Sequence, residues 1–398
     1  MGKIAIRRIG PDERVKLSLP IQSYAFRASP ASRDELVGLT ATQRFYECHT
    51  TLLAEEDGVP VADASVVPMR QNVRGTMYPM AGVAGVATLP VARRKGIARS
   101  LVLALLDQMR EGGSVVSALY PFRPSFYEKF GFVGLPAMRT ASFAPSDLAG
   151  LIRAELGGDV VCERAGVGYD TYRVFTLKLA EQRHGFAVLP DTRAVEMRDT
   201  DDCWVATARL HGEVIGAATY RITGLGGDLT VSDFLTTGPL SRALLLQFFA
   251  RHVDQVAKIV VPVSLDEAPE LWVTDLAVQI EGRTSFPEPA APMARVLALE
   301  GLAGMACGPG RVVIDVVDDP FIAGRYLLDG RSGQLVVNRQ PHSEPDSTLT
   351  VPGLSGLVYG VLDPEEVVVR RFGTMAAHAV SQLRTLFPRV TPFVFAHF

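Results

Sequence analysis

The alternation of apolar and polar positions in the first 90 residues predicts a small antiparallel sheet with helices beside it. A hairpin is expected where two alternating segments flank Glu56-Asp57-Gly58, a sequence typical of tight turns. The elements expected here are a strand at 4–9, helices around 11–26 and 32–40, strands at 50–55 and 61–68, and an apolar strand at 83–89.

The segment after this last strand has the features of a phosphate-binding helix start. Pro90 lacks an N–H and ends strand pairing. Three cations and a glycine, Arg93-Arg94-Lys95-Gly96, then precede a helix expected from Ile97. Unpaired amides, the helix dipole and a residue without Cβ favour a pyrophosphate at such a position. A solvated helix start is the simpler alternative.

The order of elements around this segment favours cofactor binding. A strand at 115–119 follows the helix, which gives a strand–helix–strand unit with its cleft beyond the strand C-termini. A strand that splays from its neighbour leaves free backbone groups, which a pantetheine chain can pair with as an added strand. Val86, Ala87 and Thr88 are the residues expected to do this.

The sequence Ser125-Phe-Tyr-Glu-Lys-Phe-Gly-Phe132 predicts a short helix closed by glycine and followed by a strand. A tyrosine has an unperturbed pKa of about 10 and a thiol one of about 8.5. Tyr127 would therefore stay protonated near neutral pH and could give a proton to a departing thiolate. The alternative is a packing aromatic, as expected of Phe126, Phe130 and Phe132.

A second module repeats the order hairpin, strand, helix, strand. Its helix start, Thr237-Gly-Pro-Leu-Ser241, offers no cation, and Pro239 removes an amide, so we expect that this copy has lost cofactor binding. The elements expected are strands at 203–210 and 213–222 about His211-Gly212, a strand at 229–235, a helix at 241–256 and a strand at 259–263.

The third part begins near Pro287, within the linker-like sequence FPEPAAP. Its α+β pattern resembles a sterol-carrier-like domain. The elements expected are a helix at 293–305, a strand at 311–317, a hairpin of 324–328 and 333–338 about Asp329-Gly330, a strand at 349–351 and a helix at 374–387.

The composition mainly argues against certain classes of protein and site. The chain has 398 residues, 47% of them hydrophobic and 21% charged, with a net charge of −3. That length predicts about two to four domains, and the charge gives no reason to expect nucleic acid. There is no apolar segment long enough for a membrane span and no signal peptide. The scattered Cys48, Cys162, Cys203 and Cys307 have no metal-ligand spacing and are expected to be reduced thiols of a cytoplasmic protein without a bound metal.

Taken together, VATLPVARRKGIAR at 86–99, SFYEKFGF at 125–132 and the terminal Phe398 resemble the GNAT acetyltransferases, and within them the Eis family of bacterial N-acetyltransferases ("enhanced intracellular survival" proteins). The resemblance implies an α+β chain of tandem GNAT-like folds at 1–150 and 151–286, the second degenerate, and a sterol-carrier-like domain at 287–398. It also implies a homohexamer and acetyl-CoA-dependent acetylation of amines, often several on one aminoglycoside. The cofactor contacts expected are Val86, Ala87, Thr88, Arg93, Arg94, Lys95, Gly96, Ile97, Ala98, Arg99, Phe122 and Arg123.

An amine substrate needs a proton acceptor, because an alkylamine has a pKa of about 10.4. Glu47, Glu55, Glu56 and Asp57 lie on or near the hairpin. The resemblance implies instead that the C-terminal carboxylate of Phe398 is the general base. The tail at 392–398 is apolar, and desolvation raises the pKa of a carboxyl from about 3.3–3.7 toward the range of a useful base. Simple docking of the tail in the core is the alternative.

The substrate is the least specified part of the hypothesis. Tyr24, Phe26, Asp34 and His397 are the expected contacts, which makes the pocket more aromatic than anionic. A lysine side chain of a protein, a polyamine or another amine therefore stays open beside aminoglycosides. Two other classes are a non-catalytic acyl-CoA sensor and a lipid-binding protein centred on 290–398.

Overall fold

The computed structural model describes residues 2–282 and 291–398 and divides into two compact units. One unit comprises 1–135, 183–194 and 289–398, and the other comprises 136–182 and 195–288. Each unit is thus assembled from separate stretches of chain, whereas three consecutive segments divided at 150 and 286 were expected. Most of the linker-like sequence near Pro287 lies outside the described residues.

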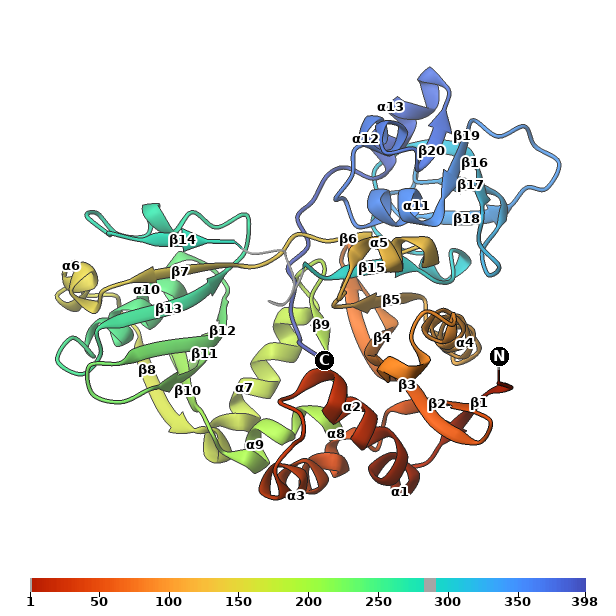
Figure 1. The fold of residues 1–398 in the computed structure, drawn as a ribbon. Coiled ribbons are helices and arrows are strands. Elements are labelled where there is room, and N and C mark those ends of the chain that lie inside the picture. The colour runs from red at the N-terminus through yellow and green to blue at the C-terminus, as the bar shows by residue number, and fades with distance from the viewer. Residues whose placement is uncertain (1, 283–290) are drawn as a thin grey trace. The chain divides into compact units, whose positions relative to one another are not determined.

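The first unit is built on a large sheet in the order β1-β2-β3-β4-β5-β15-β6, with β9 beside β3 (Figure 1). β4 and β5 are parallel, and α4 makes the connection between them. The strands are β1 (Ile4–Ile9), β2 (Thr50–Glu56), β3 (Val59–Val73), β4 (Thr76–Thr88), β5 (Val116–Leu119), β6 (Val133–Gly134), β9 (Ala187–Val188) and β15 (Met293–Val296). The strands and the hairpin predicted for this part of the chain are confirmed.

Helices cover both faces of this sheet. α4 buries Leu101 and Leu105 in one cluster with Ala62 and Ala64 of β3. On the opposite face, Ile21 of α2 packs with Leu53 of β2 and Ala87 of β4. The helices of this part of the unit are α1 (Pro11–Glu13), a π-helical segment (Arg14–Ser18), α2 (Leu19–Phe26), α3 (Arg33–Ala41), α4 (Ile97–Glu111), α5 (Pro124–Tyr127) and α8 (Asp191–Ala194).

The helix predicted at 293–305 is wrong, because Met293–Val296 forms strand β15 between β5 and β6 and only a 3-10 turn at Glu300–Leu302 follows. The side chain of Arg295 is only 1% exposed and is paired with Asp319 at 2.9 Å between Nη2 and Oδ2. The strand therefore owes its place to long-range pairing that local pattern does not reveal.

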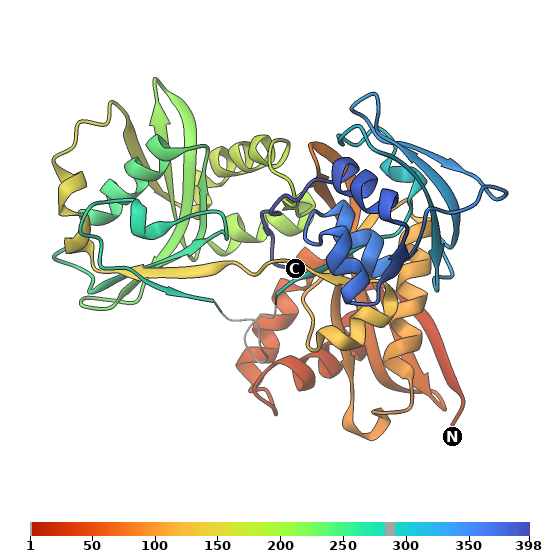
Figure 2. The ribbon, with the colours of Figure 1, turned by 90° about the horizontal axis from the view of Figure 1, so that it is seen from above.

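The C-terminal part of the first unit holds a smaller sheet in the order β18-β17-β16-β19-β20. Its apolar side chains share one core with the upper part of the main sheet, for example Leu354 with Val67 and Met80, and Figure 2 shows its helices (blue) over the ends of the main strands. The elements are β16 (Arg311–Val317), β17 (Gly324–Asp329), β18 (Val336–Arg339), β19 (Ser347–Thr350), α11 (Val351–Val358), α12 (Pro364–Val369), β20 (Gly373–Met375) and α13 (Ala377–Leu386).

The second unit has a seven-stranded sheet in the order β14-β7-β13-β12-β11-β10-β8. β12 and β13 are parallel and joined by α10, as β4 and β5 are by α4, so the predicted structural repeat is present. β7, which was expected in the first domain, pairs here with β13. The elements are β7 (Arg139–Phe143), α6 (Ala149–Ile152), β8 (Asp159–Arg164), α7 (Ala165–Ala180), α9 (Glu196–Thr200), β10 (Trp204–Leu210), β11 (Glu213–Ile222), β12 (Asp228–Thr236), α10 (Pro239–Ala250), β13 (Lys258–Val263) and β14 (Gln279–Glu281).

Candidate active site

The two parallel strands of the first unit diverge where the cofactor was expected. β4 and β5 pair from Met80–Val116 to Val83–Leu119, after which β5 ends and β4 continues to Thr88. We call this divergence the splay. Along the described residues, the edge of β4 from Ala84 to Thr88 has no strand partner on the β5 side. Its free backbone groups are of the kind that an extended amide chain can pair with.

A bulge bends β4 at the splay. Asp63 of β3 pairs with Ala87 and Ser65 pairs with Ala84, so Gly85 and Val86 together face Ala64. Gly85 has a φ of 58°, in the left-handed region. A Cβ at Gly85 would lie 2.7 Å from both Oε1 and Nε2 of Gln22 in α2. Any other residue would be strained at this φ and would displace the Gln22 amide.

The start of α4 has the backbone geometry expected for a phosphate site. Gly96 is the N-cap, with a φ of 83° and without a side chain to cap the first turn. Ile97 is buried and anchors the helix, Arg94 and Arg99 are exposed, and Ala98 is half-buried. The first-turn amides and two cations thus face outward together.

Two of the expected cationic contacts already have partners within the protein. Lys95 Nζ lies 2.7 Å from both carboxylate oxygens of Glu56. Arg93 Nε donates to the carbonyl of Thr88 at 3.1 Å, and that carbonyl is one of the groups expected to pair with pantetheine. Phosphate binding by Lys95 or Arg93 would therefore have to compete with these contacts.

The corresponding helix start of the second unit differs. The backbone N–H groups of Thr237 and Gly238 donate to Ser241 Oγ at 3.1 and 3.2 Å, and α10 begins at Pro239. These amides are satisfied by the chain itself, and the loss of cofactor binding in this copy stays a prediction.

Tyr127 ends α5 and is only 3% exposed. Its ring packs edge-on against Phe126 and Phe122, with centroids 5.0 and 5.5 Å apart. Burial raises the pKa of the Tyr127 phenol above its ordinary value, so the hydroxyl remains protonated at neutral pH. Phe122 is 48% exposed, and Arg123 is exposed as well.

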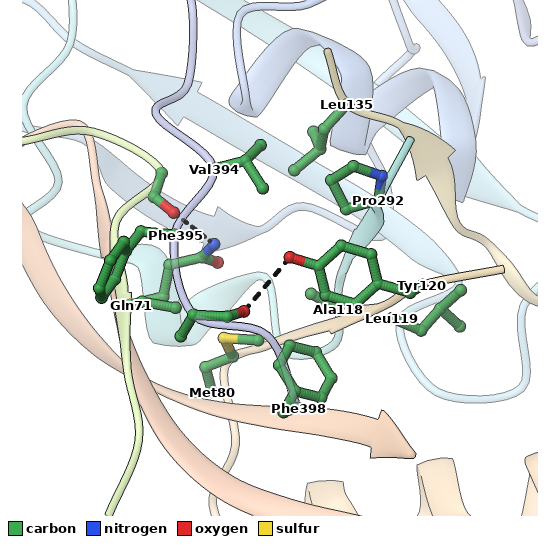
Figure 3. A pocket seen from close by; sticks show the side chains of 13 residues that line it. Gln71, Met80, Ala118, Leu119, Tyr120, Leu135, Pro292, Val394, Phe395 and Phe398 are labelled. Atoms are coloured by element: carbon green, nitrogen blue, oxygen red, sulfur yellow. Dashed lines mark hydrogen bonds between the residues drawn. The ribbon is translucent and has the colours of Figure 1, made fainter. Parts of the chain in front are cut away.

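The C-terminal tail ends on β4 near the C-terminal end of its pairing with β5. The ring of Phe398 occupies the space that a Cβ on Gly82 would need. Tyr120, the residue after β5, lies 5.6 Å from Phe398 between ring centroids, and its hydroxyl donates to the carbonyl of Ala396 at 3.3 Å (Figure 3). Sequence reasoning missed Tyr120, although its place at the end of a strand beside the expected cleft could have indicated it.

Aromatic stacking holds the rest of the tail. Phe186, which is fully buried, stacks on Phe395 at 4.2 Å and on Phe393 at 5.6 Å between centroids. The N–H of Phe393 donates to the carbonyl of His184 at 2.8 Å. The segment around Phe186 lies next to β3 through β9. The tail is therefore fixed to the main sheet by residues from the middle of the chain.

His184 adds two hydrogen bonds beside the tail, and these bonds fix its imidazole in one tautomer. Its Nδ1 accepts from the N–H of Arg74 at 3.0 Å, so Nε2 carries the proton and donates to the carbonyl of Tyr359 at 3.0 Å. Burial, with the nearby Arg74, lowers the pKa of His184 to about 4. The imidazole is therefore neutral over the physiological range.

A cavity of about 20 Å³ lies between the tail and the sheet (Figure 3). Gln71 reaches it from β3, donating to Gly185 O at 3.0 Å and accepting from the Tyr359 hydroxyl at 2.7 Å. Met80, Leu135 and Phe398 supply apolar walls. A space of this size holds about one water molecule.

The expected substrate contacts lie in two places. His397 is exposed and stacks on Tyr120, with centroids 5.1 Å apart. Tyr24 and Phe26 are 48% and 59% exposed at the end of α2, and Asp34 is exposed on α3. α2 and the tail adjoin the same strand, since Gln22 contacts Gly85 and Phe398 contacts Gly82.

The described residues lack both a metal site and a membrane-spanning helix. They contain no group of three or more His, Cys, Asp or Glu side chains arranged to hold a metal ion. Their helices are also too short or too polar to cross a membrane.

Comparison with known proteins agrees with the fold. Residues 5–134 match the model of the acetyltransferase (GNAT) domain. An uncharacterized N-acetyltransferase of Streptomyces coelicolor is 26% identical over 279 residues, which are 64% of this chain and 65% of that protein. The match thus spans just under two thirds of that relative.

Solved structures extend the similarity over the full length. A GCN5-related N-acetyltransferase from Anabaena variabilis has a TM-score of 0.83 at 16% identity, covering 98% of this chain and 99% of that one. Eis1 from Mycobacterium abscessus has a TM-score of 0.78 at 19% identity, covering both chains completely. These likenesses show a shared fold. Together with the domain match, they mean that the chain carries an N-acetyltransferase domain of the GNAT type, as the sequence predicted.

Proposed function

We propose that the protein transfers the acetyl group of acetyl-CoA directly to the amino group of a small molecule. The observation that carries the proposal is the seat of the C-terminus, with Phe398 on Gly82 of β4, next to the splay of a GNAT domain. A chain end held there would bring its carboxylate toward the region where the free edge of β4 would hold the thioester.

The proposed acetyl-CoA site uses the splay and the start of α4. The backbone of Val86 to Thr88 would pair with the pantetheine amides, and the first-turn amides of α4 would bind the pyrophosphate. Arg94 and Arg99, both exposed, would add charge-assisted contacts to the phosphates.

The proposed chemistry uses one proton acceptor for the amine and one proton donor for the departing thiolate. The ammonium first loses one proton to solvent. The neutral nitrogen then forms a C–N bond at the thioester carbonyl, and the carboxylate of Phe398 accepts the second proton from it. The C–S bond then breaks, and the Tyr127 hydroxyl gives its proton to the thiolate. Burial keeps the Tyr127 phenol protonated at neutral pH, so that a proton is available for the sulfur as the C–S bond breaks.

We further propose an Eis-like organisation, with a sterol-carrier-like C-terminal part, a degenerate second GNAT-like fold and a homohexameric assembly. The support is the full-length fold likeness to Eis1. Aminoglycosides are one substrate class to test. Among the four expected contacts, only Asp34 is acidic, which favours an amine with few positive charges.

The test is a thiol-release assay with acetyl-CoA and a panel of aminoglycosides, polyamines and lysine peptides. Turnover of a small amine that disappears when two glycines are added after Phe398, with an unchanged melting temperature, is expected. Turnover only on lysine peptides would favour a protein acetyltransferase. Binding of acetyl-CoA without any turnover would favour an acyl-CoA sensor, and full activity of the extended chain would exclude the terminal base.

A further inference from the structure

A buried carboxyl that the proposed chemistry does not use lies beside the β4 bulge. Asp63 of β3 is 0% exposed and pairs across the sheet with Ala87, just beyond the bulge. Its Oδ2 accepts from the Ser18 hydroxyl and from Gln22 Nε2 at 2.7 Å, while its Oδ1 has no hydrogen-bond partner among the described residues. Leaving a buried carboxyl half-satisfied is costly, which marks it for a role other than packing.

Gln22 connects this carboxyl to the bulge itself. The same Nε2 that donates to Asp63 also donates to the carbonyl of Gly85 at 2.6 Å. Both N–H groups of one amide are thus used, one on the carboxyl and one on the bulged residue. The Gln22 side chain also fills the space beside Gly85 that any Cβ would need. α2 therefore holds the bulge through one side chain, and Asp63 orients that side chain.

We propose that Asp63 is a positioning residue, which acts through Gln22 to hold the Gly85 bulge and so keeps the edge of β4 open for acyl-CoA. The inference rests on the proposed binding of acetyl-CoA at the splay. Asp63 is buried beneath the π-helical segment and α2, whose Ser18 and Gln22 bind its carboxyl, so it would act on the cofactor site only through Gln22. Its role is to fix the direction in which the strand leaves β5.

The charge on Asp63 sets the strength of this support. A carboxylate accepts stronger hydrogen bonds than a neutral acid does. Desolvation raises the pKa of Asp63 to about 7, opposed by Ser18, by Gln22 and by the positive charge of Arg14. Arg14, in the π-helical segment before α2, is the charged group that acts on Asp63 from the elements packed against it. The support should therefore strengthen as the pH rises through neutrality.

The experiment compares Gln22→Met with Gln43→Met in the full chain. Gln43 is a matched control, because it is also half-buried and its Nε2 also donates to a backbone carbonyl, that of Leu39 at 3.1 Å. Calorimetric titration with coenzyme A should show affinity about five- to tenfold weaker for Gln22→Met, the value of one or two net hydrogen bonds. Gln43→Met should bind as the wild type does.

Asp63→Asn supplies a second measurement, the pH dependence of coenzyme A affinity, which a purely packing role of Asp63 would not change. Asparagine resembles the neutral acid, so its affinity for coenzyme A should equal that of the wild type at pH 6 and fall below it at pH 8.5. The ratio of the two proteins' affinities at each pH does not depend on the titration of coenzyme A itself. A ratio that stays constant with pH, or equal affinities for Gln22→Met and Gln43→Met, would overturn the inference while leaving acetyl transfer intact. Wild-type protein that binds no coenzyme A would overturn both.

Discussion

The ring of Phe395 stacks on the ring of Phe186, with centroids 4.2 Å apart and planes 26° apart. This contact joins the C-terminal tail to a segment that lies more than two hundred residues earlier in the chain. The two residues also form a parallel bridge. The position of the chain end is therefore a property of the folded unit, whereas most chain ends fray.

Phe395→Ala should free the tail and lower kcat while leaving the KM for acetyl-CoA nearly unchanged. The stacking alone is worth about 0.5–1.5 kcal/mol, and the lost apolar burial adds to it. If the terminal carboxylate is the base, its displacement should lower kcat on the order of tenfold to a hundredfold. Steady-state kinetics of the variant and of Phe395→Leu, which keeps apolar bulk, would measure this. A variant with wild-type kcat would show that the tail only packs.

Gly82→Ala should act on the tail from the other side. The added methyl group would occupy the place of the Phe398 ring, so the ring must move away from β4. We expect a lower kcat and little change in the binding of coenzyme A, because Gly82 lies within the paired part of β4. Gly134→Ala is the control, since a Cβ at that strand glycine meets nothing within 4 Å. Equal kinetics for the two alanine variants would contradict the proposed seat of Phe398.

Tyr127→Phe should reduce kcat by about 10²–10⁴, the usual contribution of a general acid, with the affinity for coenzyme A retained. The phenylalanine ring preserves the packing against Phe122 and Phe126. Stopped-time thiol release and calorimetric titration of the same preparation separate the two effects. Tyr120→Phe is the informative companion variant, because it removes a hydroxyl that holds the tail at Ala396. Loss of coenzyme A binding by Tyr127→Phe would contradict its assignment as an acid.

Local pattern was sufficient for the elements whose neighbours in space are also neighbours in sequence. The hairpin of β2 and β3, the strand and helix around Gly96, and the repeat in the second unit all have this character. β15 does not, because it pairs with β5 and β6 from a distance of more than 150 residues along the chain. Its buried Arg295 is intelligible only beside Asp319.

For the candidate site, too, the features that depend on local sequence were predicted and those that depend on distant residues were not. The backbone features of the splay and the helix start follow from glycine, proline and charge, which are visible in sequence. Asp63 was not recognised, since an acid within an alternating strand is normally expected to face solvent. The pairing of Lys95 with Glu56 was missed for a related reason, because it depends on how close the end of β2 and the loop before α4 lie in the folded unit.

Asp63→Asn should make the protein less sensitive to alkaline pH. The folded-state pKa of Asp63 is about 7, against an ordinary value of 3.8. The folded protein thus holds this proton more tightly than the unfolded chain does. The stability that comes from the raised pKa is complete below the unfolded value and is lost as the pH rises through the folded one. Between these two pKa values the unfolding free energy of the wild type falls by about 4 kcal/mol, at 1.36 kcal/mol per pH unit.

Asparagine cannot ionise, so the unfolding free energy of Asp63→Asn minus that of the wild type should increase from about pH 4 to about pH 7 and stay level above that. Melting temperatures measured at half-unit steps of pH would follow this difference. Asp107→Asn, which removes an exposed carboxylate from α4, controls for net charge and should show no such rise. A constant difference across the range would mean that Asp63 ionises as an ordinary aspartate. If the stability difference rises and Asp63→Asn also binds coenzyme A more weakly than the wild type at alkaline pH, then Asp63 is a buried charge that costs stability and supports the cofactor site.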